Sequence, residues 1–371
     1  MKLLWVTAKR LGSDLASTTQ LAVANSLAKR GWDVTFVAPK NDGDVSELVK
    51  NSGHLFVGVD RSRKPGLGWF TFGRSLRKSL PKIISVDTYD VALIEWQAVA
   101  GSHATINRAG IPWLIVDRSP PVFHSLIGKL QWLEYRRAYK IAKNRGAAGS
   151  LPKSEALAHW NATNGRAVEP VTIMEAGVEV KRFTTANFSS TPTIIHHGQL
   201  DEEREIERLV SIGEILSAKE FEFIMKVAGR GNRLTALQKA ATFHDWLEVV
   251  GPVPSDEIPA FLATGHVALF PLPDSEVWRL SSPLKVREWA AAGLPMVLSD
   301  ITPHRAVGQR DWATLVRHDA PFDEWADAIM NLFESDLSIL GATARKDAEN
   351  EFDWDKTSEA LHYKLIELMK K

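Results

Sequence analysis

The chain has 371 residues and contains no cysteine. Disulfides, thiolate nucleophiles and zinc sites with cysteine ligands are therefore excluded. The sequence also lacks an apolar run near the roughly 18–20 residues that a membrane-spanning helix requires. The apolar start of the chain is closed by Lys9 and Arg10 and is too short for a signal peptide. We therefore expect a soluble protein that resides in the cytoplasm.

Net charge is absent as well, because 45 Lys and Arg balance 45 Asp and Glu. The balance conceals two halves of opposite sign. Residues 1–190 hold 26 basic and 15 acidic residues, a net charge of +11, so the rest of the chain carries −11. The length suits two domains of roughly 150–200 residues. The charges favour domains with different partners, the basic one facing an anionic surface. The alternative is that the two halves simply attract one another.

Strand-like and helix-like segments alternate along the first half. Residues 2–7 form a short apolar run, residues 15–30 carry apolar positions at helical spacing, and residues 34–38 form a second apolar run. A strand, a helix and a strand in this order predict a parallel sheet with right-handed crossovers. Further strands are expected at 91–95, 113–116, 147–151 and 171–174, with a helix at 98–108.

The same alternation restarts after residues 184–193, a stretch poor in apolar residues that predicts a linker. Strands are then expected at 193–197, 223–228, 247–250, 267–270 and 295–298, and helices at 205–218, 232–241, 255–264 and 282–292. The predicted fold class is α/β, with two Rossmann-like, doubly wound parallel-sheet domains that face each other across a cleft. We expect domains at 1–183 and 194–352, and a final helix within 353–371 that packs back on the first domain.

Several ligand-binding motifs are missing. No GxGxxG follows the first strand and no GxxxxGK[ST] occurs, so the sequence supports neither dinucleotide binding nor a P-loop. No Asp pair with DxD spacing stands at a predicted strand end, so a metal-bound diphosphate is not expected. His196 and His197 end a predicted strand, and we interpret them as loop histidines near the ligand site. No metal site is predicted.

The strongest local signal lies in residues 281–298, SSPLKVREWAAAGLPMVL. Pro283 suits the first turn of a helix, and Lys285 and Glu288 follow on roughly one face. Unpaired N–H groups and the positive dipole end at such a helix start favour a phosphate. The carboxylate can accept hydrogen bonds from two sugar hydroxyls. The alternative is a surface ion pair between the two side chains.

Glu288 with the WAAAGLPMV that follows it resembles the donor-binding helix of retaining glycosyltransferases of family 4, which have the two-domain GT-B fold. Other segments resemble that family in order and spacing across nearly the whole chain. They are residues 30–34, 175–179 with Phe183, 197–200 with Arg204, 229–231, 251–253 with 258–261, and 352–354.

The resemblance implies a retaining transfer of a sugar from a nucleotide-sugar donor, linked to UDP or GDP, to a hydroxyl of a glycan or lipid-linked acceptor. The donor is a substrate, and neither a cofactor nor a metal is implied. Arg204 and Lys285 would act in catalysis by stabilising the departing diphosphate, while Glu288 holds the ribose. The donor-binding residues carried over are Gly198, Gln199, Arg204, Gly229, Arg230, Ser281, Ser282, Leu284, Lys285 and Glu288.

Some positions depart from the family pattern. Leu280 stands where the family has the first Glu of an E-x7-E pair, and Gln199 stands where it has an Arg. Residues 281–285 replace a glycine-rich loop. A subset of the family has such a PLK-x-x-E pattern, so we interpret the chain as an active variant. The alternatives are a non-catalytic homologue that binds sugar nucleotides and a nucleotide-sugar epimerase.

Acceptor-side residues are expected in the first domain. Asp117 and Arg118 follow a predicted strand, where the family has a His or Asp near the reacting sugar. Asp117 is the third catalytic candidate because it can orient an acceptor hydroxyl or take its proton, and Arg118 can hold an anionic group. The other acceptor-binding candidates are Gly12, Ser13 and His124. The alternative is that the Asp-Arg pair only braces a turn.

Residues 61–82, from Arg61 to Lys82, contain seven basic and no acidic residues, and Trp69, Phe70 and Phe72 are expected to be exposed. Such a segment is typical of contact with an anionic membrane. We therefore predict a peripheral location on the inner face of the plasma membrane and a role in making a cell-surface polysaccharide or glycolipid. The alternatives are a solvated loop and helix, or a nucleic-acid contact. No nucleic-acid partner is expected.

Overall fold

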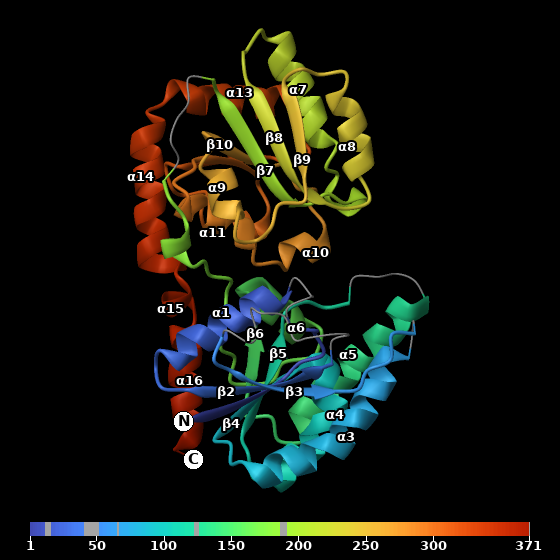
Figure 1. Ribbon diagram of the computed structural model, residues 1–371. Coiled ribbons are helices and arrows are strands. Elements are labelled where there is room, and N and C mark those ends of the chain that lie inside the picture. Colours follow the sequence, from blue (N-terminus) through green and yellow to red (C-terminus); the bar gives the residue numbers. More distant parts are fainter. Residues whose placement is uncertain (12–15, 41–51, 65–66, 122–125, 186–190, 371) are drawn as a thin grey trace. The chain divides into compact units, whose positions relative to one another are not determined.

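The chain folds into two compact units, which Figure 1 shows in a computed structural model. The structure describes residues 1–11, 16–40, 52–64, 67–121, 126–185 and 191–370. The first unit comprises Met1–Ala176 and Trp354–Lys371, and the second comprises Gly177–Asp353. The first unit holds 28 basic and 17 acidic residues, and the second holds 17 and 28. The opposite charges that the sequence indicated therefore belong to the folded units themselves.

The first unit contains a six-stranded, fully parallel sheet of order β3-β2-β1-β4-β5-β6. Its strands are β1 (Lys2–Val6), β2 (Asp33–Pro39), β3 (Leu55–Val59), β4 (Val91–Glu95), β5 (Trp113–Asp117) and β6 (Ser150–Pro152). This is the strand order of the Rossmann fold, in which the winding reverses between β1 and β4. The buried central strands are continuous apolar runs because helices cover both faces of such a sheet.

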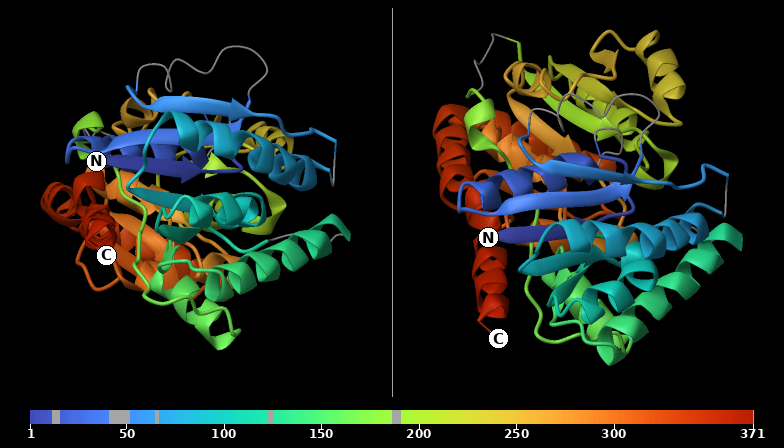
Figure 2. Two further views of the ribbon diagram at one scale, coloured as in Figure 1. Left: turned by 90° about the horizontal axis from the view of Figure 1, so that it is seen from below. Right: turned by 60° about the horizontal axis from the view of Figure 1, so that its bottom comes forward.

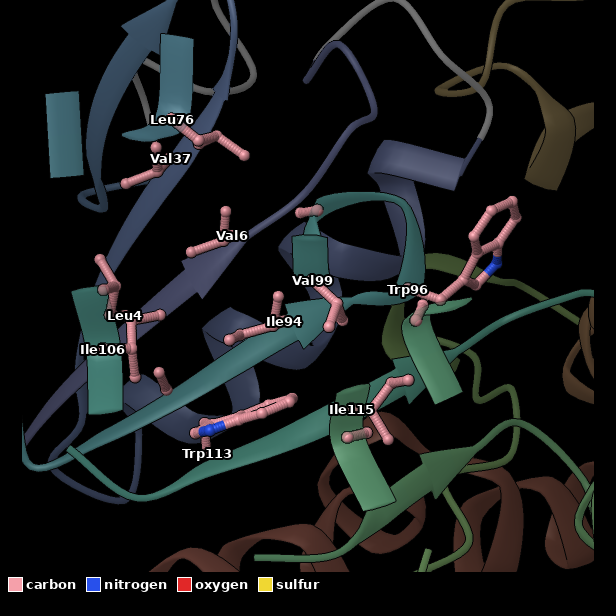
Figure 3. Close-up of a cluster of buried hydrophobic side chains, with 14 of the residues drawn as sticks. Leu4, Val6, Val37, Leu76, Ile94, Trp96, Val99, Ile106, Trp113 and Ile115 are labelled. Atoms are coloured by element: carbon pink, nitrogen blue, oxygen red, sulfur yellow. The ribbon is translucent and has the colours of Figure 1, made fainter. Parts of the chain in front are cut away.

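Helices α3 (Gly68–Val86), α4 (Trp96–Arg108) and α5 (Leu126–Asn144) lie side by side over one face of this sheet (Figure 2). Their apolar sides meet the inward residues of the strands. In Figure 3, Leu4, Val37 and Ile94 of the strands and Leu76, Val99 and Ile106 of the helices belong to one cluster of buried side chains, in which Val37 lies beside Leu76 and Leu4 beside Ile106. Doubly wound topology places α1 (Ala16–Ala28), which connects β1 to β2, on the opposite face.

The final helices, α15 (Trp354–Thr357) and α16 (Glu359–Met369), return to the first unit. Their side chains contact α1 and the turn after it. The hydroxyls of Ser26 and Ser358 are 2.7 Å apart, and Trp32 Nε1 donates to His362 Nδ1 at 3.1 Å. Leu361 and Leu365 of α16 are fully buried. The last helix therefore supplies part of the first unit's core.

The second unit repeats the same topology. Its parallel sheet has the order β12-β11-β10-β7-β8-β9, which is again the Rossmann order with its reversal between β7 and β10. The strands are β7 (Thr193–Gln199), β8 (Ile224–Arg230), β9 (Leu247–Gly251), β10 (Val267–Phe270), β11 (Met296–Ser299) and β12 (Ala313–Val316). The carboxyl ends of β7 and β10 are therefore where a ligand site is expected.

Helices cover both faces of the second sheet (Figure 1). One face carries α7 (Arg208–Ala218), α8 (Leu234–Ala241) and α13 (Phe322–Glu334), and the other carries α9 (Ile258–Leu262), α11 (Leu284–Ala291) and α14 (Leu337–Asp347). Shorter helices α10 (Glu276–Arg279) and α12 (Thr302–Arg305) follow β10 and β11. The first unit also contains α6 (Glu155–Thr163).

Two boundary expectations need correction. Residues 177–183, expected in the first domain, belong to the second unit, because Val178 N donates to Phe352 O at 2.8 Å and Phe183 is buried in the second core. The strand expected at residues 171–174 does not form, since Val171 makes only one isolated bridge, to Ser150. Residues 186–190 of the expected linker lie outside the described residues.

We expect Leu365→Ala to lower the free energy of unfolding of the first unit by about 3 kcal/mol, as truncating a fully buried leucine leaves a cavity. Urea unfolding followed by circular dichroism measures the change. Tyr363→Ala is the matched control on the same helix, because Tyr363 is 63% exposed. Equal unfolding curves for the two variants would contradict the packing of α16 described above.

Candidate functional site

The pairing of β7 with β8 in the second sheet brings two predicted glycine positions together. Gly198 and Gln199 end β7, and they pair in register with Gly229 and Arg230, which end β8. Gly198 has a φ of +122° and Gly229 a φ of +153°. A Cβ on Gly229 would lie 1.8 Å from Gly198 O. Only glycine permits this backbone geometry, which opens the carboxyl ends of both strands.

Lys285 lies directly against Gly198. A Cβ on Gly198 would lie 2.3 Å from Lys285 Cε, so the absent side chain is what lets the lysine cross the strand end. Its Nζ stands 4.5 Å from the centroid of the Phe270 ring at the end of β10. The nitrogen has no accessible surface and makes no hydrogen bond within the described part of the chain. Burial first, and then the charge of Arg204, hold the pKa of Lys285 well below its usual range.

Arg204 provides a second cation at this strand end. Its guanidinium stacks on the ring of Trp278, with 4.3 Å between Cζ and the ring centroid. Trp278 Nε1 donates to Glu203 O at 3.1 Å, and Ser281 Oγ donates to Trp278 O at 2.7 Å. Burial lowers the pKa of Arg204. Trp278, which the sequence analysis did not single out, therefore links Arg204 to Ser281.

Glu288 is held by a neighbouring histidine and not by Lys285. His197 Nε2 lies 3.0 Å from Glu288 Oε2, and Trp289 Nε1 donates to His197 Nδ1 at 3.0 Å. An indole N–H can only donate, so His197 Nδ1 is the acceptor and Nε2 carries the proton given to Glu288. The ion pair between Lys285 and Glu288 that was the alternative interpretation does not form. His197 is thus a positioning residue for Glu288.

Two further histidines face Phe270. His196 Nδ1 donates to Leu269 O at 2.9 Å and His304 Nδ1 donates to Ser299 O at 2.8 Å. Each ring therefore turns an unprotonated Nε2 into the interior, where it has no partner within the described residues. Burial lowers the pKa of both, that of His304 to about 4. Both rings are neutral at physiological pH.

The remaining donor-side residues surround these groups less closely. Ser282 and Leu284 are half-buried at the start of α11, and the Arg230 side chain is exposed at the end of β8. Leu280, at the position of the family's first Glu, is 5% exposed and packs at the end of α10. The structure therefore brings Lys285, Arg204 and Glu288 to one strand edge of the second unit, with the other predicted residues around them.

Asp117, predicted as a catalytic residue, does not face a ligand site in this structure. Its side chain is fully buried, and its Oδ2 accepts hydrogen bonds from Tyr135 Oη at 2.6 Å, Tyr139 Oη at 2.6 Å and Asn161 Nδ2 at 2.9 Å. Burial and the negative charge of Asp117 raise the pKa of both tyrosines. The carboxylate therefore ties α5 and α6 to the sheet, and the structure does not support a catalytic role.

The other acceptor-side candidates have different outcomes. Gly12, Ser13 and His124 lie outside the described residues. Arg118 begins the loop after β5 and is half-buried, and its Nη1 has no accessible surface. Arg118 is therefore the acceptor-side candidate whose surroundings the structure describes.

A cavity of about 520 Å³ lies at the carboxyl edge of the first sheet. It is lined by residues that follow β1, β3, β4 and β5 and by the facing sides of α3 and α5. The residues that line it include Lys9, Arg63, Lys64, Trp69, Trp96 and Ser119. Trp96, which lies beyond the end of β4 in Figure 3, donates from Nε1 to Ser119 O at 3.1 Å. Cations and indole rings thus line a hollow at the first winding reversal.

Most of residues 61–82 form the first part of α3. Phe70 is 54% exposed and Trp69 is 37% exposed, whereas Phe72 is fully buried against the sheet. The expectation that Phe72 is exposed is therefore wrong, because it lies on the apolar side of an amphipathic helix. The basic residues Arg74, Arg77, Lys78 and Lys82 all lie on the exposed side.

Two searches of the described residues bear on metals and membranes. No group of three or more His, Asp or Glu side chains there could hold a metal ion. No helix in that part of the chain combines the length and the apolar character of a membrane span.

Residues 191–335, most of the second unit, match the family model of glycosyl transferases group 1. No curated protein matches the sequence. The family match covers the strand edge that carries Arg204, Lys285 and Glu288.

Solved structures with this fold are similar over the whole chain. A sucrose-phosphate synthase from Thermosynechococcus elongatus aligns at 15% identity and a TM-score of 0.72, over 99% of this chain and 98% of its own. A glycosyltransferase from Rickettsia africae aligns at 15% identity and 0.76, over 100% and 99%. Anabaena HepE in complex with UDP aligns at 15% identity and 0.76, over 99% and 100%. The prediction of the GT-B fold is confirmed.

We expect stability to fall between pH 6.5 and pH 4 in part because of His304. The unfolded chain binds a proton on this ring near its usual pKa of 6.5, whereas the folded chain does so near 4. The contribution is fully present above pH 6.5 and is lost as the pH falls toward 4, by about 3 kcal/mol. Urea unfolding of wild type and His304→Asn at several pH values measures it.

The asparagine variant should lose this part of the pH dependence, because its amide does not titrate. His159→Asn replaces an exposed histidine and should keep the wild-type slope. If His304→Asn retained that slope too, His304 would titrate normally in the folded protein and the buried site would be incorrectly described.

Proposed function

We propose that the protein is a retaining glycosyltransferase that moves a sugar from a nucleotide-sugar donor, linked to UDP or GDP, to a hydroxyl of a glycan or lipid-linked acceptor. The observation that carries the proposal is the set Arg204, Lys285 and Glu288 at the carboxyl end of β7. Two half-buried cations that form no ion pair within the described residues favour a bound dianion such as a diphosphate, and the neighbouring carboxylate can bind hydroxyls. The family match over residues 191–335 supports a donor of this class.

The proposed chemistry is electrostatic. As the bond between the sugar and the diphosphate breaks, negative charge grows on the phosphate oxygens, and Arg204 and Lys285 stabilise it. A bound diphosphate also raises the proton affinity of Lys285, so the lysine is charged when the donor is present. The acceptor hydroxyl then attacks the sugar on the face that the diphosphate leaves, and its proton passes to a phosphate oxygen of the departing diphosphate. Neither a covalent nucleophile nor a metal ion is needed in this scheme.

Glu288 holds the ribose in this proposal. His197 and Trp289 fix its Oε2, while Oε1 makes no hydrogen bond within the described residues. One carboxylate oxygen is thus positioned and the other is available to two neighbouring hydroxyls. Holding the carboxylate in one rotamer reduces the entropy lost when the donor binds.

A panel of nucleotide sugars based on UDP, GDP, ADP, CMP and TDP tests the proposal. Binding is measured by calorimetry, and transfer to a cellular acceptor extract is measured by release of the nucleotide, a nucleoside diphosphate for all of these donors except CMP sugars, which release CMP. We expect binding and transfer with one donor class, unchanged by EDTA. No binding and no turnover with any donor would refute the proposal. Binding without transfer would make the chain a non-catalytic homologue, and isomerisation of the donor without acceptor would make it an epimerase.

We expect Glu288→Ala to weaken binding of the donor found in that panel by roughly 30-fold, or about 2 kcal/mol, because a charged hydrogen-bond acceptor is lost. Calorimetry with the purified variant measures the dissociation constant. Glu248→Ala, on an edge strand of the same unit and about half exposed, is the control and should bind as wild type does. Unchanged donor affinity in a folded Glu288→Ala protein would remove Glu288 from the ribose site.

We also propose that an exposed patch of the first unit, formed by α3 and α5, rests on an anionic membrane. Its large apolar side chains are Leu67, Trp69, Phe70, Leu130 and Leu133. Its exposed cations are Arg74, Arg77, Lys78 and Lys82 on α3 and Lys129, Arg136, Arg137, Lys140 and Lys143 on α5. Aromatic and leucine side chains enter the headgroup boundary while the cations meet lipid phosphates. The protein would then act at the inner face of the plasma membrane.

The two helices pack on either side of α4 and come close to each other at the cavity. Trp69 of α3 and Glu134 of α5 line the same cavity, and the charge of Arg77 acts on Glu134. The first unit also has eleven more basic than acidic residues, so its charge draws it toward such a surface. A membrane-bound first unit would meet lipid-linked acceptors where they are made.

Reversing Arg74, Arg77 and Lys78 to Glu should abolish sedimentation with vesicles of equal parts phosphatidylglycerol and phosphatidylcholine at low salt. Each basic residue near such a surface contributes about 1 kcal/mol, so three reversals remove the attraction. Reversing Lys239, Arg317 and Lys346 in the second unit changes the net charge equally and should leave sedimentation intact. A wild-type protein that ignores these vesicles would show that the acceptor is soluble.

A further inference from the structure

The carboxyl edge of the first sheet gathers basic side chains. Five of its six strands are followed within three residues by Lys or Arg. These residues are Lys9, Lys40, Arg61, Arg118 and Lys153. Because all six strands are parallel, every one of these positions lies at the same edge. Two of them, Arg118 and Lys153, are also direct neighbours.

The register of β5 and β6 places Arg118 beside Lys153. Asp117 pairs with Pro152, which is the last pair of the two strands, and Lys153 N donates to Asp117 O at 3.0 Å, so Arg118 and Lys153 directly follow the same pair. Neighbouring strands are roughly 4.8 Å apart, so the two residues leave the sheet close together, and the charge of Arg118 acts on Lys153. Two like charges so placed repel each other.

Neither side chain is neutralised by a contact. Within the described residues, Arg118 and Lys153 form no ion pair and no side-chain hydrogen bond, and Nη1 of Arg118 is wholly buried. Burial lowers the pKa of Arg118. Burial and then the charge of Arg118 lower the pKa of Lys153 to about 8. Both cations thus carry a desolvation cost without a bound counter-ion.

The nearby carboxylates act on these cations only through space. Glu95 attracts Arg118, but its Oε2 accepts a hydrogen bond from Thr7 Oγ1 at 2.7 Å. Glu95 Oε1 accepts from Gln20 Nε2 at 2.5 Å. Asp117 attracts Lys153; its Oδ2 accepts three side-chain hydrogen bonds, and its buried Oδ1 has no hydrogen-bond partner among the described residues. Both carboxylates are thus held by neutral donors, and neither forms an ion pair with Arg118 or Lys153 within the described part of the chain.

We propose that Arg118 and Lys153 together bind an anionic group, a phosphate or a carboxylate, carried by the acceptor. Assigning the anion to the acceptor rests on the proposed glycosyl transfer, whereas the anion site itself does not. A guanidinium holds two oxygens of such a group in one plane, and an ammonium can take a third. Ser119, the residue after Arg118, lines the cavity described above together with Trp69 and Trp96. The rest of the acceptor would lie in that cavity.

The first experiment measures anion binding without any donor. The unfolding temperature of the full chain is compared in 20 mM sodium phosphate and in sodium chloride of equal ionic strength. A ligand that binds only the folded state raises this temperature, and we expect a rise of about 3 °C. Arg118→Gln and Lys153→Gln should each lose most of the rise. Arg108→Gln, an exposed arginine on α4, is the control and should keep it.

The unfolding temperatures of Lys285→Gln in phosphate and in chloride show which unit binds the phosphate, because phosphate bound near Lys285 would stabilise the second unit. The rise assigned to Arg118 and Lys153 should persist in this variant. An equal rise in Arg118→Gln, Lys153→Gln and wild type, or no rise in wild type, would overturn the proposal. Lys153→Met in chloride gives a further check. It removes the repulsion and keeps the aliphatic stem, so a fall of several degrees would show a paired lysine and count against the proposal.

Three further arms identify the source of the anion. Protection by glucose 6-phosphate that Arg118→Gln abolishes indicates a soluble phosphate acceptor, and protection by glucuronate indicates a carboxylate acceptor. Loss of sedimentation with the phosphatidylglycerol vesicles in Arg118→Gln, without protection by either soluble compound, indicates a lipid phosphate. A protein that shows the phosphate response but transfers no sugar would refute the proposed function and leave the anion site standing.

Discussion

Parallel pairing of every strand is the constraint on which the site depends. In each six-stranded sheet the strands end at one edge, so residues far apart in the sequence become neighbours there. His197 and Glu288 are 91 positions apart and share a hydrogen bond because one lies near the end of β7 and the other lies in α11, the helix before β11. The Rossmann order then selects the place within that edge, since the winding reverses beside β7 and β10 and leaves room between the helices. Gly198 keeps this room open by letting Lys285 cross the strand end.

Buried charge distinguishes the proposed binding residues from the structural ones. Burying a charge costs free energy that only close partners offset. Asp117 has such partners, three donors on one oxygen, and it serves to join helices to the sheet. Lys285, Arg118 and Lys153 have none within the described residues, and burial lowers the pKa of each. An apolar residue at these positions would avoid the free-energy cost of burying a charge. That the fold keeps a cation there supports a binding role for it.

The sequence predicted those parts of the fold and site that depend on local patterns. Apolar runs located most strands, but β3 and β12 are short and only partly buried, so no strong run marks them. Glycines at strand ends and the start of α11 located Lys285, Glu288 and Gly229. The roles of His197, Trp278 and Lys153 come from contacts between distant segments, which no spacing reveals. Asp117 was misassigned for the same reason, because its partners lie on α5 and α6 and their approach is a property of the folded unit.

The net charge of the second unit opposes the anionic donor proposed above, since that unit has eleven more acidic than basic residues. Distance decides between the two effects. Exposed charges more than about 10 Å from the bound anion are largely screened at physiological salt. Two cations that touch the anion and are shielded from water act on it at a much lower dielectric constant. His197 reduces the opposing effect of Glu288 by donating a hydrogen bond to one of its oxygens. The attraction of the anion to Arg204 and Lys285 therefore outweighs its repulsion by the acidic surface.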